Sequence, residues 1–270
     1  MNEPATTPTP PFPVAPPTTT VHPSLRGRTV LVTGALGGLG AAIVDAFAVS
    51  GASVVVHHIG QRTEAEARVA HLRAAGTSAY AVEADVTDWD SVAAMTDEIR
   101  EAVGPVDVLV NNAGFMAPGR LADLSLAEWR RTLSVDLDGV FLCCRHVLGP
   151  MLARGTGAIV NVSSQLAFKG ARDYTSYCAA KAGVAGLTRA LAREVGPAIR
   201  VNAIAPGPVD TPFITPWATE EWKRERTGDL VIGRLATPEE IAPTVAFLAS
   251  DDGALFQGQV LHLNGGGVMA

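Results

Sequence analysis

The chain has 270 residues, of which 47% are hydrophobic and 6% aromatic, which suits one large domain with a two-sided core. Its 21 basic and 27 acidic residues give a formal net charge of −6, which argues against a nucleic-acid-binding face or a polybasic membrane patch. The three cysteines, two of them adjacent, fit neither a disulfide framework nor a metal site, so we expect a reducing, cytoplasmic compartment and no bound metal.

The first 24 residues differ in composition from the rest, since eight are proline and six are threonine. Because proline lacks a backbone donor and favours extended structure, we expect 1–24 to form a disordered tail ahead of a single domain over 25–270. The tail lacks the cationic start and apolar core of a secretory signal, and no later stretch has the apolar length of a membrane span. A docking motif for a proline-binding module is the alternative interpretation of the tail.

From residue 28 onward, short apolar runs alternate with helical patterns. Strands are predicted at 29–33, 53–57, 79–83, 106–110, 158–162, 199–203 and 259–263. Helices are predicted near 38–50, 63–75, 88–103, 125–153, 173–195 and 238–250. Three of these helices begin with a capping-box pattern, at Thr63 with Glu66, Ser125 with Glu128, and Thr237 with Glu240. The alternation predicts an α/β fold with a doubly wound, parallel, seven-stranded sheet of Rossmann type and helices on both faces.

Ligands of such sheets bind beyond the carboxyl ends of the strands, so the loops there are the candidate site. The first strand runs into a glycine-rich turn, 33–40, and then into a helix. Glycines at 34, 38 and 40 let a pyrophosphate approach the backbone, and the helix N-terminus supplies donors and positive potential. The candidate cofactor residues of this turn are Gly34, Leu36, Gly38, Leu39 and Gly40. An ordinary strand–helix turn is the alternative.

Two further loops are open to both a functional and a structural interpretation. Asn112, Ala113 and Gly114, after the fourth strand, suit a turn, or they lie along a cofactor. Asp85 and Val86, after the third strand, hold an adenine amino group, or they cap the next helix.

Tyr177 and Lys181 are four residues apart in a predicted helix, so both side chains leave the same face. A phenol titrates near pH 10, and an ammonium one turn away favours the phenolate. Ser164 precedes Tyr177 by thirteen residues, and a Pro206-Gly207 loop with Val209 and Thr211 follows the sixth strand.

Over about residues 26–268 the chain resembles the short-chain dehydrogenase/reductase family. The resemblance rests on five motifs in the order of the family: Gly34, Gly38 and Gly40, the Asn111–Gly114 run, Ser164, the Tyr177–Lys181 pair and the Pro206-Gly207 loop. The closing segment 258–266 is similar to that of 3-oxoacyl-carrier-protein reductases. The resemblance implies that Tyr177 is the catalytic acid or base and that Ser164 holds the substrate oxygen. It implies that Lys181 binds the nicotinamide ribose and lowers the Tyr177 pKa. It also implies that Pro206, Gly207, Val209 and Thr211 hold the carboxamide end of the cofactor.

One catalytic position departs from the family pattern, because Asp136 stands where the family usually has Asn. In one interpretation the backbone carbonyl there holds a water that leads to the Lys, and the carboxylate changes little. In the other, the Asp136 carboxylate partly offsets Lys181, so the pKa of Tyr177 is lowered less and the working pH rises.

The end of the second strand bears on cofactor choice. Members that prefer NAD usually place Asp there to bind the ribose hydroxyls, whereas His58 stands here. Nothing then repels a 2′-phosphate, and His58, Gln61 and Arg62 are candidates to contact it, although Arg62 also suits a solvated helix start. Gly37 occupies the position where NADP users often carry Arg. We expect NADP(H) in preference to NAD(H).

The resemblance predicts a ketoreductase similar to 3-oxoacyl reductases that acts on a small-molecule carbonyl or alcohol. The alternatives are an NAD-linked sugar, steroid or secondary-alcohol dehydrogenase and, from another class, a cofactor-binding regulator without turnover. Residues 211–234, with Phe213, Trp217 and Trp222, correspond to a substrate lid. In the family, helix 125–153 and the Tyr177 helix form a four-helix contact, so a homodimer or homotetramer is expected. Cys143, Cys144 and His146 on the former are expected to be packing residues.

Overall fold

The computed structural model describes residues 20–216 and 218–269. Its strands are β1 (Thr29–Val32), β2 (Ser53–His58), β3 (Ala79–Glu83), β4 (Val108–Asn111), β5 (Gly157–Val162), β6 (Ile199–Pro206) and β7 (Val260–Leu263). Its α-helices are α1 (Gly38–Val49), α2 (Arg62–Ala74), α3 (Trp89–Val103), α4 (Leu126–Leu133), α5 (Gly139–Arg154), α6 (Leu166–Lys169), α7 (Thr175–Val195), α8 (Glu220–Gly228) and α9 (Pro238–Ala249).

The seven strands form one parallel sheet in the order β3-β2-β1-β4-β5-β6-β7, which confirms the predicted doubly wound fold. The chain order reverses between β1 and β4, and a crevice forms at the carboxyl ends of strands at such a point.

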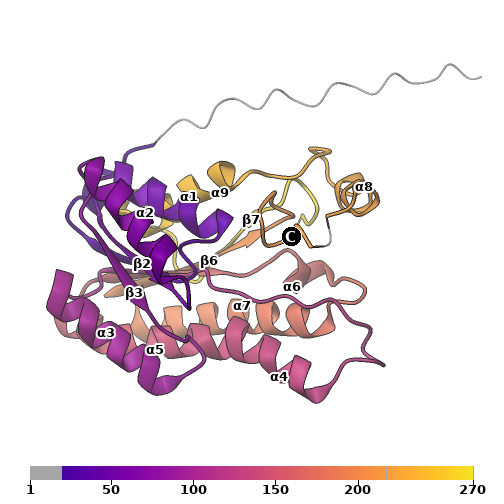
Figure 1. The fold of residues 1–270 in the computed structure, drawn as a ribbon, viewed down its shortest axis with the longest axis horizontal. Helices are drawn as coiled ribbons and strands as arrows, with labels where there is room; N and C mark the ends of the chain where they lie inside the picture. The colour runs from indigo at the N-terminus through magenta and orange to yellow at the C-terminus, as the bar shows by residue number, and fades with distance from the viewer. Residues whose placement is uncertain (1–19, 217, 270) are drawn as a thin grey trace, which may run out of the picture.

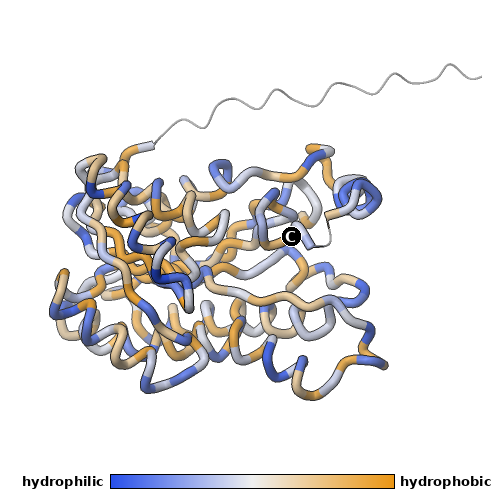
Figure 2. Tube along the Cα trace, in the orientation of Figure 1, coloured by the Kyte–Doolittle hydropathy of each residue, from blue (hydrophilic) through white to orange (hydrophobic). Residues whose placement is uncertain are grey.

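Helices cover both faces of the sheet (Figure 1). Successive strand residues point to opposite faces, so Val30 and Val32 pack with α1, α2 and α9, while Leu31 packs with α3, α5 and α7. Figure 2 shows the apolar strands enclosed between these two layers. Because both faces of the sheet are covered, central strands such as β1 and β4 are buried along their whole length and are apolar runs, not alternating ones. Cys143 and Cys144 pack in the second layer, as predicted.

The prediction of one regular helix over 125–153 is wrong. The segment consists of α4, a π-helical turn η2 (Ser134–Asp138), and α5. Its start is confirmed, because the Ser125 hydroxyl accepts the Glu128 N–H while the Glu128 carboxylate accepts the Ser125 N–H. The capping box predicted at Thr63 is wrong, since α2 begins one residue earlier and Gln61 occupies its N-cap. Near 237 the Glu240 carboxylate accepts the Thr237 N–H.

Residues 1–19, most of the predicted tail, lie outside the described residues. Packing on the domain begins at His22, two residues before the predicted end of the tail at residue 24. His22 is buried, its backbone N–H donates to Ser50, and its ring lies 2.6 Å from the Asp252 carboxylate. The short turn η1 (Pro23–Leu25) then leads into β1.

Candidate functional site

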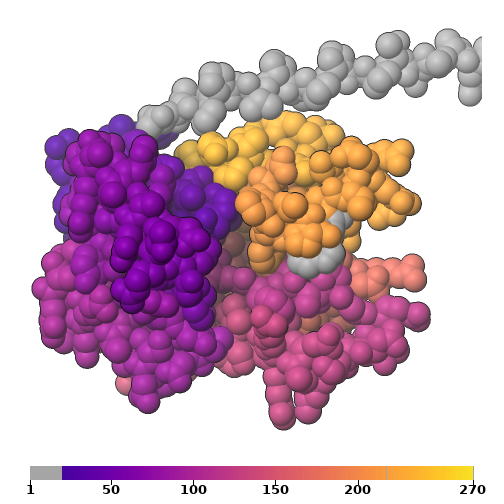
Figure 3. Space-filling view, in the orientation of Figure 1, coloured from indigo at the N-terminus to yellow at the C-terminus, as the bar shows by residue number. Residues whose placement is uncertain are grey.

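A cavity of about 350 Å³ lies at the carboxyl ends of the central strands. Figure 3 shows the surface hollowed between the N-terminal segments and the orange segment that carries α8. Most of the predicted site residues line it: Gly34, Gly38, Leu39, Gly40, Asn112, Ala113, Gly114, Ser164, Tyr177, Lys181, Pro206, Gly207, Val209 and Thr211. Gly34 and Thr211, the outermost of these residues, are 177 positions apart in the sequence and line the same cavity.

The glycine-rich turn is packed too closely for side chains. A Cβ at Gly40 would lie 2.2 Å from the Gly34 carbonyl oxygen, so only glycine fits there. The first turn of α1 directs backbone N–H groups without intrahelical partners toward the cavity. These donors and the helix dipole suit a pyrophosphate.

Two side chains fix the turn to the neighbouring loop. The Thr33 hydroxyl accepts the backbone N–H groups of Asn112 and Ala113, both at 3.0 Å. The Asn112 amide donates in return to the carbonyls of Thr33 and Gly34. The β1 and β4 loops are thus held as one unit.

The end of β5 fixes Lys181. Its ammonium donates to the Val162 carbonyl at 3.1 Å, and the Ser163 hydroxyl donates to the Lys181 carbonyl at 2.8 Å. The ammonium lies 5.6 Å from the centroid of the Tyr177 ring. The predicted pairing of Tyr and Lys on one helix face is therefore present in α7.

Asp136 lies behind this pair and is fully buried. Its carboxylate is 2.9 Å from the Lys181 ammonium and accepts the Phe115 N–H at 3.0 Å. A Cβ at Gly114 would approach the same carboxylate to 2.9 Å, so the loop after β4 lies directly on it. The π-helical turn η2 carries Asp136 into this position. Of the two interpretations of Asp136, the direct ion pair supports the one in which the carboxylate offsets Lys181.

The charges of the three groups are coupled. Burial raises the pKa of Tyr177, Lys181 opposes this, Asp136 adds to it, and a hydrogen bond with Ser164 opposes it. Burial lowers the pKa of Lys181, but Asp136 and the phenol outweigh it, so that pKa is raised. Burial raises the pKa of Asp136 against the attraction of Lys181. Lys181 therefore stays cationic, and the Asp136 carboxylate offsets part of its stabilising effect on the Tyr177 phenolate.

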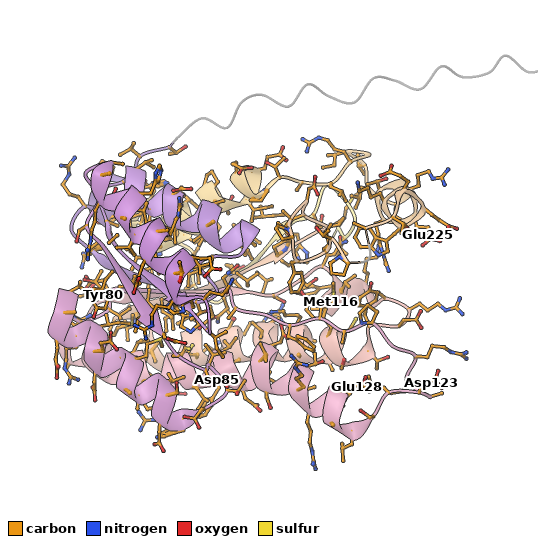
Figure 4. All side chains as sticks on the ribbon, in the orientation of Figure 1. Tyr80, Asp85, Met116, Asp123, Glu128 and Glu225 are labelled. Atoms are coloured by element: carbon orange, nitrogen blue, oxygen red, sulfur yellow. The ribbon has the colours of Figure 1, made fainter. Side chains whose placement is uncertain are left out.

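The end of the cavity next to α8 is apolar apart from one cationic side chain among the described residues. Met116, Tyr174 and Ile214 form a buried cluster against which Trp222 packs. Figure 4 labels Met116 between the α7 layer and the segment that carries α8. Phe213 and Arg226 also line this end, whereas Trp217 lies outside the described residues.

Five predicted cofactor residues do not line the cavity, namely Leu36, His58, Arg62, Asp85 and Val86. Leu36 packs against the core, and His58 and Val86 are buried. The Arg62 guanidinium is 3.0 Å from the Glu83 carboxylate, which also accepts the Gly60 N–H. Asp85 accepts the backbone N–H and the hydroxyl of Thr87, whereas Asp88 is the N-cap of α3, so Asp85 does not cap the next helix as the alternative interpretation had it.

His57 is a site residue that the sequence analysis missed. Its Nδ1 accepts the Gly34 N–H at 3.0 Å, and its Nε2 donates to the Ala84 carbonyl at 3.1 Å. Burial lowers its pKa to about 4, so the ring stays neutral and holds the turn in place. A histidine ending an apolar strand run was the available signal.

Comparison with known proteins agrees with this geometry. The sequence profile of the family described as enoyl-(acyl carrier protein) reductase matches residues 34–267. The chain is 46% identical over 241 residues to a cis-4-hydroxycyclohexanecarboxylate dehydrogenase of Sinomonas cyclohexanicum, an alignment that covers 88% of this chain and 96% of the relative. The chain belongs to the short-chain dehydrogenase/reductase family.

Other members of the family are similar along the same span. A 3-oxoacyl-(acyl-carrier-protein) reductase of Staphylococcus aureus is 39% identical over 240 residues, covering 88% of this chain and 97% of the relative. Nodulation protein G of Azospirillum brasilense is 38% identical over 240 residues, with the same coverage. This short-chain dehydrogenase/reductase is therefore an NAD(P)-dependent oxidoreductase that acts on CH–OH groups. Within residues 20–216 and 218–269, no helix has the length and apolarity to cross a membrane.

Proposed function

We propose that this short-chain dehydrogenase/reductase interconverts a secondary alcohol and a ketone, with Tyr177 exchanging the proton at the substrate oxygen. The observation that carries the proposal is the single cavity that unites the glycine-rich turn with Ser164, Tyr177 and Lys181. The turn supplies a tight backbone cradle for a pyrophosphate, and the phenol lies where a substrate oxygen could reach it.

The residues present fit a nicotinamide dinucleotide, which supplies or accepts a hydride when bound. The proposed holders are the turn at Gly34–Gly40, the loop of Asn112, Ala113 and Gly114, and the loop that begins at Pro206. In reduction, the Tyr177 hydroxyl gives its proton to the substrate oxygen as the carbonyl carbon gains the hydride. In oxidation, the phenolate removes the alcohol proton. Ser164 orients the oxygen, and Lys181 stabilises the phenolate.

For the cofactor, we propose NADP(H) in preference to NAD(H). The support is that no carboxylate of the described residues lines the cavity, so a 2′-phosphate meets no buried negative charge there. Arg62 is held by Glu83, which limits what it offers a phosphate.

For the substrate, two classes compete, and both are named by relatives: a 3-oxoacyl thioester and a cyclic secondary alcohol. We favour a compact cyclic substrate, because the lid end of the cavity is closed by Met116, Tyr174, Ile214 and Trp222. We also propose a cytoplasmic homodimer or homotetramer. Phe141 on α5 is 48% exposed, which suits a helix face covered by a second copy, and light scattering of the purified protein tests this.

The test of function is a substrate panel with both cofactors in both directions, followed at the absorbance of the reduced nicotinamide. It includes 4-oxocyclohexanecarboxylate and an acetoacetyl thioester. Tyr177→Phe should lower kcat by about 10²- to 10⁴-fold, the usual contribution of a positioned acid or base. Near-normal turnover by a folded Tyr177→Phe variant would remove Tyr177 from the mechanism.

A further inference from the structure

Arg226 is a cation in the apolar end of the cavity with no role in the proton transfer. It lies in the last turn of α8 and is half-buried. Its guanidinium carbon is 5.2 Å from the centroid of the Tyr174 ring and 5.6 Å from that of Trp222. The two rings hold the guanidinium at the cavity wall, since Tyr174 and Trp222 both line the cavity as well.

This cation has no acidic partner within the described chain. Among residues 20–216 and 218–269, no carboxylate lies within ion-pair distance of Arg226. Its neighbour Glu225, labelled in Figure 4, is exposed on the outer side of α8. The nearby Trp222 Nε1 is buried and has no hydrogen-bond partner among the described residues. A guanidinium and an indole N–H, both donors without an acceptor, therefore meet at one end of the cavity.

Apart from the backbone cradle proposed for the pyrophosphate of the cofactor, the side-chain charges of the cavity point to a substrate that is a monoanion. The cationic side chains that line it, among the described residues, are Lys181 and Arg226. The Lys181 charge is matched by Asp136 at 2.9 Å, which leaves one unmatched positive charge. One planar guanidinium suits one carboxylate through paired N–H···O bonds, whereas a phosphate dianion calls for more positive charge.

We propose that Arg226 binds a carboxylate of the substrate, so the substrate class is a secondary hydroxy acid or oxo acid with a compact apolar body. This inference rests on the proposed function of the same cavity. The reacting oxygen lies at Tyr177 and Ser164, the apolar body packs against Met116, and the acid lies at the lid. Arg226 thereby determines specificity and takes no part in the proton transfer.

The kinetic test compares 4-oxocyclohexanecarboxylate with the neutral 4-oxocyclohexanecarboxamide. Arg226→Gln should lower kcat/KM for the oxo acid by about 10- to 100-fold, mainly through KM, since a hydrogen bond to a charged group is lost. Its effect on the amide should stay within about threefold, a range set by the few tenths of a kcal/mol typical of surface changes. Arg226→Lys should recover part of the loss, because it keeps the charge and loses the planar fork. Arg224→Gln, an exposed change on the same helix, is the control.

An equal loss on both substrates would show that Arg226 only holds the lid through its ring contacts and would overturn the inference. A full rate with the oxo acid in Arg226→Gln would overturn it too. Calorimetry with cyclohexanecarboxylate, which has no carbonyl to reduce, separates this inference from the proposed reaction. Binding to the holoenzyme that is lost in Arg226→Gln supports the anchor even if no ketone is turned over. Absence of binding to the wild-type holoenzyme would refute the anchor while leaving ketone reduction intact.

Discussion

Replacing Asp136 with Asn tests how the buried ion pair sets the working pH. The substitution removes one negative charge and keeps an oxygen that can accept from Phe115 and Lys181. A negative charge disfavours the phenolate, so its removal should lower the Tyr177 pKa. The Lys181 ammonium lies 2.9 Å from the Asp136 carboxylate and 5.6 Å from the centroid of the Tyr177 ring, so the carboxylate and the ring are at most about 8.5 Å apart. At that separation and an effective dielectric constant of about 20, one unit charge contributes about 2 kcal/mol, which equals about 1.5 pKa units.

The assay is the pH dependence of kcat/KM for alcohol oxidation, which requires the phenolate. The rising limb of the profile should move to lower pH by about one to one and a half units in Asp136→Asn, as the calculated charge effect requires. Asp138→Asn makes the same charge change two residues away at an exposed position, so its profile should match the wild type. Coincident profiles for Asp136→Asn and the wild type would refute the coupling and restore the interpretation in which the carboxylate changes little.

Three further predictions concern the cofactor side of the cavity. Glu83→Gln should release Arg62 and lower KM for NADPH by about two- to fivefold with little change for NADH, measured by initial rates; an unchanged ratio would exclude Arg62 from phosphate binding. Gly40→Ala should abolish cofactor binding in a fluorescence titration, because its Cβ meets a carbonyl oxygen at 2.2 Å, whereas Gly37→Ala, with its nearest atom at 3.5 Å, is the control that should bind. His57 has a folded-state pKa of about 4 against about 6.5 when unfolded, so the unfolded chain gains a proton first as the pH falls from 6.5 to 4. The stability advantage of wild type over His57→Asn in urea denaturation should therefore shrink by about 3 kcal/mol between pH 7 and pH 4; a constant difference would contradict the buried neutral ring.

The sheet and most of the cavity were predictable because their signals are local. Apolar runs such as those around Val55 and Ile159 have strand length and are bounded by helix starts. The glycine-rich turn and the Tyr177–Lys181 spacing can each be recognised from a few consecutive residues. Parallel strands then bring their carboxyl ends together, so separate motifs converge on one edge.

What was missed depends on contacts between segments far apart in sequence. The only local signal for the break in the helix at 125–153 is Gly139, directly after the π turn, and the turn is understood only once Asp136 meets Lys181 and Phe115. The bond from Gly34 to His57 joins two strands through a side chain whose neighbours the sequence does not show. The sequence around Arg226 has the ordinary pattern of an exposed helix face. It does not show that the rings of Tyr174 and Trp222 lie against the guanidinium.

The π-helical turn η2 also fixes the permitted length of the chain between α4 and α5. Deleting one residue from Ser134–Asp138 would return the segment to 3.6 residues per turn, with α4 and α5 keeping their faces, and would remove the turn that carries Asp136. Asp136 would then leave the Lys181 ammonium while every neighbouring residue kept its identity. A relative aligned with a one-residue gap here would therefore need a different way to support its lysine, and gap placement becomes a criterion for sorting family members by active-site type.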